Sequence, residues 1–86
     1  MDRNRVVVNR PNVSLTAAEI MQRYFVNGCN NPDRPSGLFA GAIGAYDTET
    51  SSMTIEAELR QSTSETVGRE AISRAFGFAE AIDVAG

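Results

Sequence analysis

The sequence contains no histidine and no lysine, so all eight of its basic residues are arginine. Histidine is the usual proton carrier and metal ligand near neutral pH, and lysine is the usual amine nucleophile and phosphate-loop cation. With Cys29 as the single cysteine, a disulfide within the chain is excluded, and so is the cluster of Cys and His ligands that holds structural zinc. These absences favour a protein that binds over one that catalyses, and we expect no metal or other cofactor.

Long apolar runs are also missing. No stretch approaches the roughly 20 residues that span a bilayer, and the first residues lead into only three valines rather than a signal peptide. We therefore expect a cytoplasmic location and no membrane partner. With 86 residues, the chain is expected to form a single domain over 1–86. A domain this small buries only about two thirds of the surface of its unfolded chain, so we expect a stabilising partner, although a well-packed monomer is an alternative.

Charge is unevenly distributed along the chain. Residues 1–10 hold three arginines against one aspartate, whereas the rest holds five arginines against ten acidic residues. The isoelectric point near 4.8 argues against a nucleic-acid partner. Arginine forms planar, bidentate bonds to carboxylates and is enriched at protein interfaces, although these arginines could also only keep a first strand soluble. The expected partner is a protein with an acidic surface, or a second copy of the chain, and the residues expected to bind it are Arg3, Arg5, Arg10 and Arg34.

Three strands are predicted. Residues 5–9 contain a run of three valines, which predicts a strand covered on both faces. Residues 53–60 alternate apolar and polar side chains, which predicts one core face and one solvent face. Residues 38–46 are small and apolar throughout and could form a strand or a helix. The alternation that follows them favours a central strand, closely approached by other backbone and paired with 53–60 as a hairpin.

The first predicted helix covers residues 17–27. Thr16 opens a candidate capping box at its start, and Tyr24 falls in the apolar stripe expected to face the core. Residues 28–37, which follow the helix, are rich in Pro, Asn and Gly and predict a loop, with Gly28 as a left-handed stop.

The second predicted helix follows Ser62, which opens another candidate capping box. Its expected core stripe consists of Val67, Ala71, Ala75, Phe78 or Ala79, and Ile82, flanked by Ile72 and Phe76. Glycine disfavours a helix by nearly 1 kcal/mol relative to alanine, so a bend or a stop is expected near Gly77.

The predicted order is strand, helix, strand, strand, helix. It corresponds to a small α+β fold of the ferredoxin-like type without a clear last strand, with both helices on one face of a three-stranded sheet. If residues 5–9 take the middle of the sheet beside the hairpin, one edge stays open. An open edge can pair with another chain.

Binding is the function that this pattern favours. We expect a non-catalytic subunit or adaptor that docks into a larger protein assembly through the Arg-bearing N-terminal strand or arm, residues 1–10, and the open sheet edge. The alternative is a self-associating or regulatory domain that binds a small ligand in an apolar pocket between the helices and the Gly-rich strand, where Phe39 and Ile43 fall on one predicted face. The expected lining of that pocket is Tyr24, Phe39, Ile43 and Phe76.

An enzyme is the least favoured interpretation. Glu56 and Glu58 share one strand face at a spacing of roughly 7 Å, which suits the paired carboxylates of a glycosidase or part of a calcium site. The solvent face of an amphipathic strand gives the same pattern. Cys29 lacks the imidazole that usually activates a thiol, so we expect it to be buried and inert.

Overall fold

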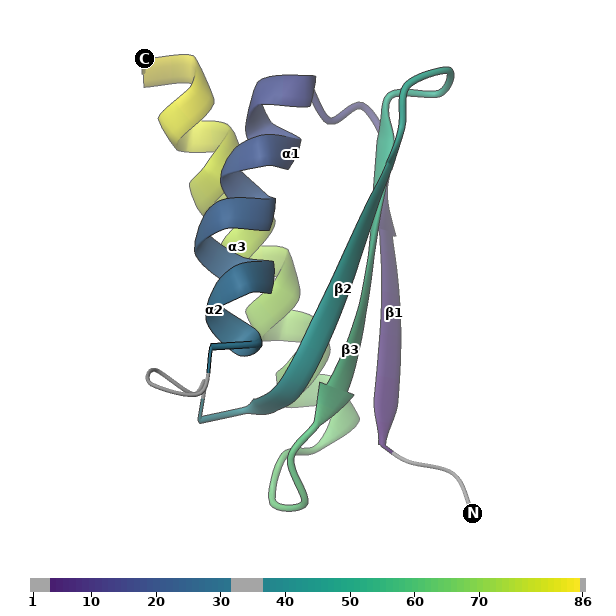
Figure 1. Ribbon diagram of the computed structural model, residues 1–86, viewed down its shortest axis with the longest axis vertical. Coiled ribbons are helices and arrows are strands. Elements are labelled where there is room, and N and C mark those ends of the chain that lie inside the picture. The colour runs from purple at the N-terminus through teal and green to yellow at the C-terminus, as the bar shows by residue number, and fades with distance from the viewer. Residues whose placement is uncertain (1–3, 32–36, 86) are drawn as a thin grey trace.

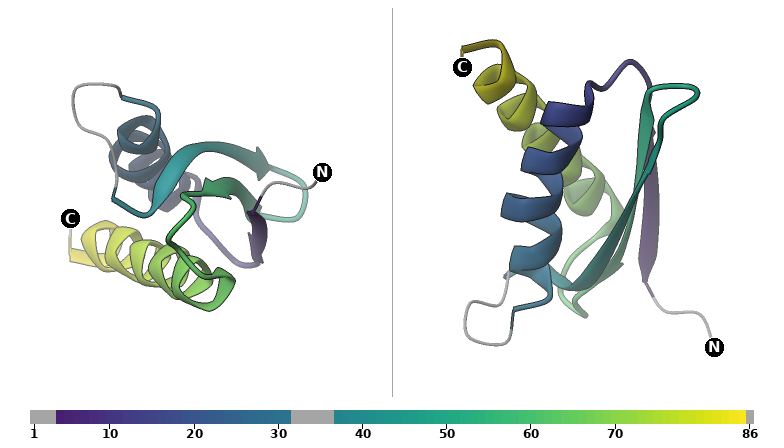
Figure 2. Two further views of the ribbon diagram at one scale, coloured as in Figure 1. Left: turned by 90° about the horizontal axis from the view of Figure 1, so that it is seen from below. Right: turned by 45° about the horizontal axis from the view of Figure 1, so that its top comes forward.

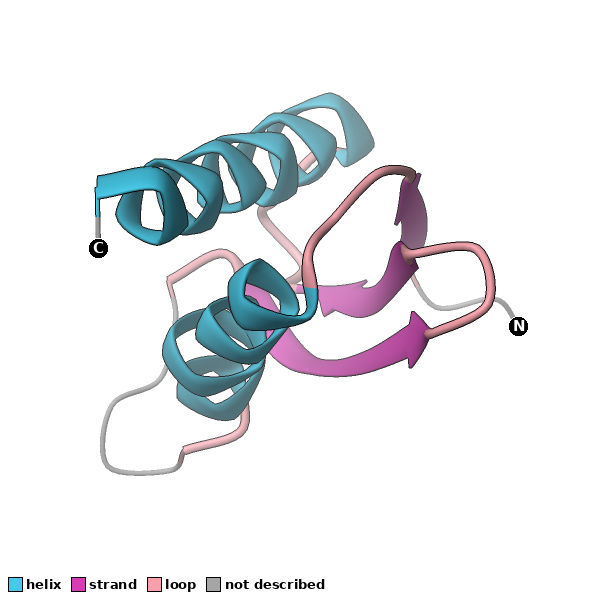
Figure 3. Cartoon of the chain, turned by 90° about the horizontal axis from the view of Figure 1, so that it is seen from above, coloured by secondary structure: helices cyan, strands magenta, loops and turns pink. Residues whose placement is uncertain are grey.

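A computed structural model describes residues 4–31 and 37–85. Its strands are β1 (Arg5–Arg10), β2 (Phe39–Asp47) and β3 (Ser52–Leu59). Its helices are α1 (Leu15–Met21), which continues through η1 (Gln22–Val26) and α2 (Asn27–Cys29), and α3 (Glu65–Ala85). The helices lie side by side on one face of the sheet, as Figure 1 and Figure 3 show. The predicted small α+β fold is therefore confirmed.

The central strand of the sheet is β3, because the strand order is β1-β3-β2 and both pairings are antiparallel. The middle position expected for residues 5–9 and the central position expected for 38–46 are both wrong. The short turn after β2 makes it pair with β3, and β1 takes the outer side of β3 rather than that of β2. β1 is an edge because the described chain contains no strand that could follow α3 and cover it.

Only one face of β1 is covered. Val6 is 1% exposed against the helices, whereas Val7 is 51% exposed on the other face. The expected cover on both faces is therefore wrong. β-Branched residues are favoured in strands for their fit to a pleated surface, so a run of valines indicates a strand without fixing how many of its faces are buried.

An irregularity in β2 changes which of its residues face the core. The register with β3 shifts between Phe39 and Gly41, and Phe39 is 1% exposed whereas Ile43 is 65% exposed. Strict alternation would put these two side chains on the same face. The extra residue of a β-bulge reverses the phase, so Phe39 joins the core and Ile43 turns away from it.

The first helix contains a π-helical segment, η1. Met21 and Val26 lie five residues apart and are both buried, which is the spacing of a π turn. The wider turn rotates Tyr24 out of the apolar stripe, so that it is 64% exposed. The expected core position of Tyr24 is therefore wrong, because that expectation assumed a period of 3.6 residues throughout.

Ser14, rather than Thr16, caps the first helix. Its hydroxyl accepts a hydrogen bond from the Ala17 N–H at 3.0 Å, so the helix begins two residues earlier than predicted. It also runs past the expected stop at Gly28 and ends at Cys29, and no described glycine has a positive φ. Several hydroxyl residues in a row offer several possible caps, and packing selects among them.

A serine also caps α3, again at a later position in a run of candidates. The Ser64 hydroxyl, rather than that of Ser62, accepts from the Val67 N–H at 3.2 Å. The helix is then continuous for 21 residues, so the stop expected near Gly77 does not occur. Its buried residues are Gly68, Ile72, Phe76 and Ala79. This stripe lies one position to the side of the predicted one, which leaves Phe78 62% exposed.

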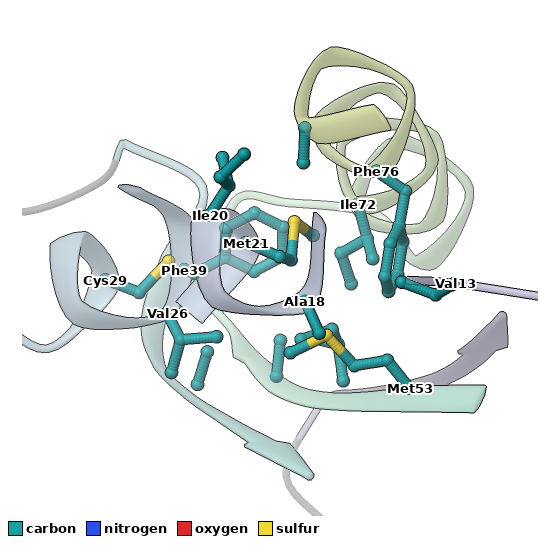
Figure 4. Close-up of a cluster of buried hydrophobic side chains, with 14 of the residues drawn as sticks. Val13, Ala18, Ile20, Met21, Val26, Cys29, Phe39, Met53, Ile72 and Phe76 are labelled. Atoms are coloured by element: carbon teal, nitrogen blue, oxygen red, sulfur yellow. The ribbon is translucent and has the colours of Figure 1, made fainter. Parts of the chain in front are cut away.

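The core fills the space between the helices and the inner face of the sheet (Figure 4). Its largest members are 2% exposed or less and come from every layer: Met21, Phe39, Met53, Ile55, Ile72 and Phe76. Gly44 of β2 lets η1 lie close above the sheet, because a Cβ there would be 2.8 Å from the Gln22 Oε1 and 3.2 Å from the Val26 Cγ2. The close neighbours of Gly44 are side-chain atoms, rather than the backbone that the small residues of this strand predicted.

Candidate interaction surface

The face of the sheet that is turned away from the helices is uncovered within the described chain (Figure 2). Val7 of β1 and Ile43 of β2 are both register partners of Glu56 on β3, so the three side chains form one row across this face. Val7 is 51% exposed and Ile43 is 65% exposed. The row therefore presents one aliphatic side chain on each side of a carboxylate.

Arg5 lies on the same face, next to this row. Its Nη1 donates to the Glu56 Oε2 at 2.5 Å, and the two side chains are 53% and 42% exposed. Such an exposed pair contributes little to stability. The bond uses one of the five N–H donors of the guanidinium, so the others can reach a second carboxylate. A hollow of about 270 Å³ opens beside the pair, where β3 adjoins the bulged part of β2.

The free edge of β1 is partly shielded by α3. The Asn4 carbonyl accepts from the Leu59 N–H, and antiparallel alternation from that pair turns the backbone groups of Arg5, Val7 and Asn9 away from β3. Arg69 of α3 donates to the Val7 carbonyl at 3.1 Å. One edge group in the middle of the strand is thus occupied by a side chain.

The free edge of β2 is shielded in a different way, by Asn30 just after α2. The Asn30 amide donates to the Ala42 carbonyl at 2.6 Å, and its Oδ1 accepts from the Ala42 N–H at 3.1 Å. This side chain therefore pairs with Ala42 much as the backbone of a neighbouring strand would. Shielded edges are a common protection against uncontrolled strand pairing.

Arg10 belongs to the opposite face of β1. Its Nη2 donates to the Glu80 Oε1 at 2.9 Å, and its guanidinium carbon lies 5.7 Å from the centre of the Phe76 ring. It therefore fastens β1 to α3 and shares no surface with Arg5. The other two arginines expected to bind a partner, Arg3 and Arg34, lie outside the described residues.

Replacing Arg10 with alanine should lower the free energy of unfolding by about 1–2 kcal/mol. The variant loses a half-buried ion pair, a cation–π contact and the packing of the arginine stem. Urea denaturation measures the change. The matched control is Arg5→Ala, which should cost less than about 0.5 kcal/mol because its pair is more exposed. Equal losses in the two variants would contradict the assignment of Arg10 to the fold and Arg5 to the surface.

The four residues expected to line a ligand pocket are not brought together. Phe39 and Phe76 are 1% and 0% exposed inside the core. Ile43 lies on the helix-free face of the sheet, and Tyr24 lies on the helix layer. The bulge in β2 and the π turn in η1 separate them, since each shifts its element by one residue.

Three candidate residues remain, namely Glu56, Glu58 and Cys29. Glu56 and Glu58 both occupy the helix-free face of β3, and Cys29 is 7% exposed at the end of α2. Within 4–31 and 37–85, no group of three or more His, Cys, Asp or Glu side chains could hold a metal ion. None of the helices in these ranges combines the length and apolar character needed to cross a bilayer.

Sequence reasoning missed an apolar surface on the helix layer. Tyr24 and Phe78 border a hollow of about 130 Å³ between α1–η1 and α3. The signal was visible in α3, which carries two adjacent apolar stripes, one through Ile72 and Phe76 and one through Phe78 and Ile82. A helix beside a sheet buries only one such stripe against it.

Among the described residues, the helix-free sheet face with the β1 edge and the hollow on the helix layer are thus two surfaces that can contact another molecule. Comparison with protein-family models, curated proteins and solved structures finds no significant match to this chain.

Proposed function

We propose that this domain is a non-catalytic small subunit or adaptor that docks onto a protein partner through the helix-free face of its sheet and the free edge of β1. The observation that carries the proposal is the row of Val7 and Ile43 across that face, where both side chains are more than half exposed. Burying each of them against a partner would contribute roughly 1–2 kcal/mol.

The β1 edge supports a partner that adds an extended segment. The edge-facing backbone groups of Arg5 and Asn9 lie on either side of the Val7 carbonyl that Arg69 occupies. In β-augmentation, main-chain bonds at such an edge supply affinity, and side-chain contacts on the sheet face supply specificity. The row through Val7 lies directly beside the edge and can supply those contacts.

The chemistry of the partner follows from Arg5. Its remaining donors suit a carboxylate, which an acidic protein segment can provide. The acidic isoelectric point of the chain supports a protein over a nucleic acid as partner. The lack of histidine and lysine supports binding over catalysis. A cytoplasmic site of action is part of the same proposal.

The test is capture of partners from an extract of the source cells, with the chain immobilised, followed by titration of the captured partner. We expect Val7→Glu and Ile43→Glu each to weaken binding at least tenfold, because each introduces a charge into an apolar contact. Arg5→Glu should weaken it as well, because the replacement repels the acidic segment.

The matched control is Val67→Glu, since Val67 is 44% exposed on α3 in the helix layer. This variant should bind as the wild type does. Circular dichroism checks that every variant is folded. Equal binding by the Val7, Ile43 and control variants, or turnover of a substrate by the purified chain, would refute the proposal.

A further inference from the structure

The helix layer carries a second apolar surface, independent of the sheet face. One stripe of α3 is buried against the sheet, and the adjacent stripe consists of Ala71, Ala75, Phe78 and Ile82. Phe78 is 62% exposed and Ile82 is 37% exposed. A Phe side chain of which most stays in solvent is costly unless another surface covers it.

The π turn of η1 adds to this surface. It turns Tyr24 outward to 64% exposure, next to a hollow of about 130 Å³ that Tyr24 and Phe78 border together. π-Helical turns occur often at functional positions, because an α-helix without them would be more stable. Here the turn moves Tyr24 from the core position that a regular α-helix predicts to an exposed one.

Charges on the exposed face of α1 and η1 indicate what covers the surface. Glu19 and Arg23 are exposed and lie one turn apart along α1 and η1, and the Arg23 guanidinium carbon is 5.8 Å from the centre of the Tyr24 ring at the hollow. This face is therefore negative toward the start of the helix and positive toward its end. A surface with this polarity is complementary to itself when one copy is turned end over end.

We propose that two copies of this chain associate through their helix layers, around a two-fold axis perpendicular to α1. In this arrangement α1 runs antiparallel to α1 of the second copy, so Glu19 of each lies opposite Arg23 of the other. α1 and α3 are antiparallel and meet at the Ser14–Asp83 hydrogen bond, and Phe78 shares the hollow with Ile20 and Tyr24, so it lies at the level of the turn that begins at Glu19. The two Phe78 rings then meet near the axis and fill the hollows. Such an interface is isologous and closes at two copies.

The helix-free sheet face lies on the other side of the molecule from the helix layer (Figure 2), and the β1 edge lies beside α3 at Arg69, away from Phe78. The dimer therefore leaves the proposed docking surface accessible, and each surface can be tested without the other. A dimer would also present two docking surfaces, which raises the avidity for a multivalent partner.

The test is sedimentation equilibrium of the purified chain from micromolar to millimolar concentration. We expect the apparent mass to rise from that of a 9.3 kDa monomer to twice that value. Phe78→Glu should weaken association at least tenfold. Val84→Glu is the matched control on the same helix, because Val84 is 86% exposed and points about 120° away from Phe78 at 100° per residue; it should dimerise as the wild type does.

A charge exchange tests the antiparallel arrangement. Glu19→Arg alone and Arg23→Glu alone should each weaken the dimer, because each places like charges opposite one another, and the double variant should restore it. A wild type that stays monomeric at millimolar concentration overturns the proposal. So does a Phe78→Glu variant that dimerises normally, or a double variant no stronger than the single ones. The two proposals have separate readouts. Phe78→Glu should change dimerisation and leave partner binding intact, whereas Val7→Glu should weaken partner binding and leave dimerisation intact.

Discussion

Replacing Asn30 with aspartate should lower the free energy of unfolding by about 3 kcal/mol at neutral pH. The Asn30 amide donates to two carbonyl oxygens, that of Val26 at 3.1 Å and that of Ala42 at 2.6 Å. A carboxylate only accepts, so these two hydrogen bonds become two repulsive contacts between oxygens. The substitution changes neither the size nor the shape of the side chain, so packing is not the cause of the loss.

The penalty should shrink in acid. A protonated carboxyl regains one donor, so its pKa is raised in the folded state above the unfolded value of about 3.9. The stability linked to a raised pKa is present in full below the unfolded value and is lost as the pH rises through the folded value. The variant should therefore recover part of its stability between about pH 7 and about pH 4.

The control for this pH dependence is Asn30→Ala. It loses the bonds to Val26 and both bonds to Ala42 and should cost about 2 kcal/mol at every pH. Urea denaturation of the two variants in parallel gives the difference directly and removes the pH dependence of the rest of the protein. A difference that does not change with pH would contradict the donor role of Asn30.

Replacing Gly68 with alanine should destabilise the protein by about 1–2 kcal/mol, although alanine favours a helix. A Cβ at this position would lie 2.3 Å from the Leu59 Cδ2 and 3.6 Å from the Phe39 Cε1. Leu59 is 6% exposed and Phe39 is 1% exposed, so neither side chain can move away freely. Overpacking of this kind costs about 1–3 kcal/mol, which outweighs the gain of nearly 1 kcal/mol in helix propensity.

The same substitution at Gly77 should have the opposite sign. Gly77 lies in the same helix with nothing within 4 Å of a Cβ, so Gly77→Ala should raise the free energy of unfolding by nearly 1 kcal/mol. Thermal or urea denaturation of the two variants compares them. Gly68→Ala should destabilise a Leu59→Ala variant less than it destabilises the wild type, because the shortened side chain at position 59 removes the clash. Stabilisation by Gly68→Ala would refute the close contact between α3 and β3.

The sequence predicted β3 well, because its apolar and polar residues alternate with a period of two and the apolar ones are those that are buried. Met53 and Ile55 are buried, and Glu56 lies on the helix-free face, as the alternation requires. Two irregularities were not predictable in the same way. The bulge before Gly41 and the π segment Gln22–Val26 each add a residue to a periodic pattern, so every later side chain changes direction. Packing between elements determines where such residues are accommodated, and no single residue type marks them.

The candidate site was predictable only in part. The strand spacing itself separates Arg5 from Arg10, because an odd interval along a strand places two side chains on opposite faces. Their partners could not be predicted, since Glu56 and Glu80 come from β3 and α3. The two apolar stripes of α3 were visible, but the choice of Phe76 over Phe78 for the core depends on the angle at which the helix crosses the sheet.

The order of the strands also has a consequence for how the chain folds. The β2–β3 hairpin joins neighbouring segments, whereas the pairing of Val6 with Ala57 joins distant ones. Distant pairing costs more loop entropy and slows folding. We therefore expect β1, which is synthesised before β2 and β3, to be the last of the three strands to join the sheet. Until it does, the edge of β3 that will pair with β1 is unpaired and exposed. A chaperone that binds this edge would therefore increase the yield of native protein.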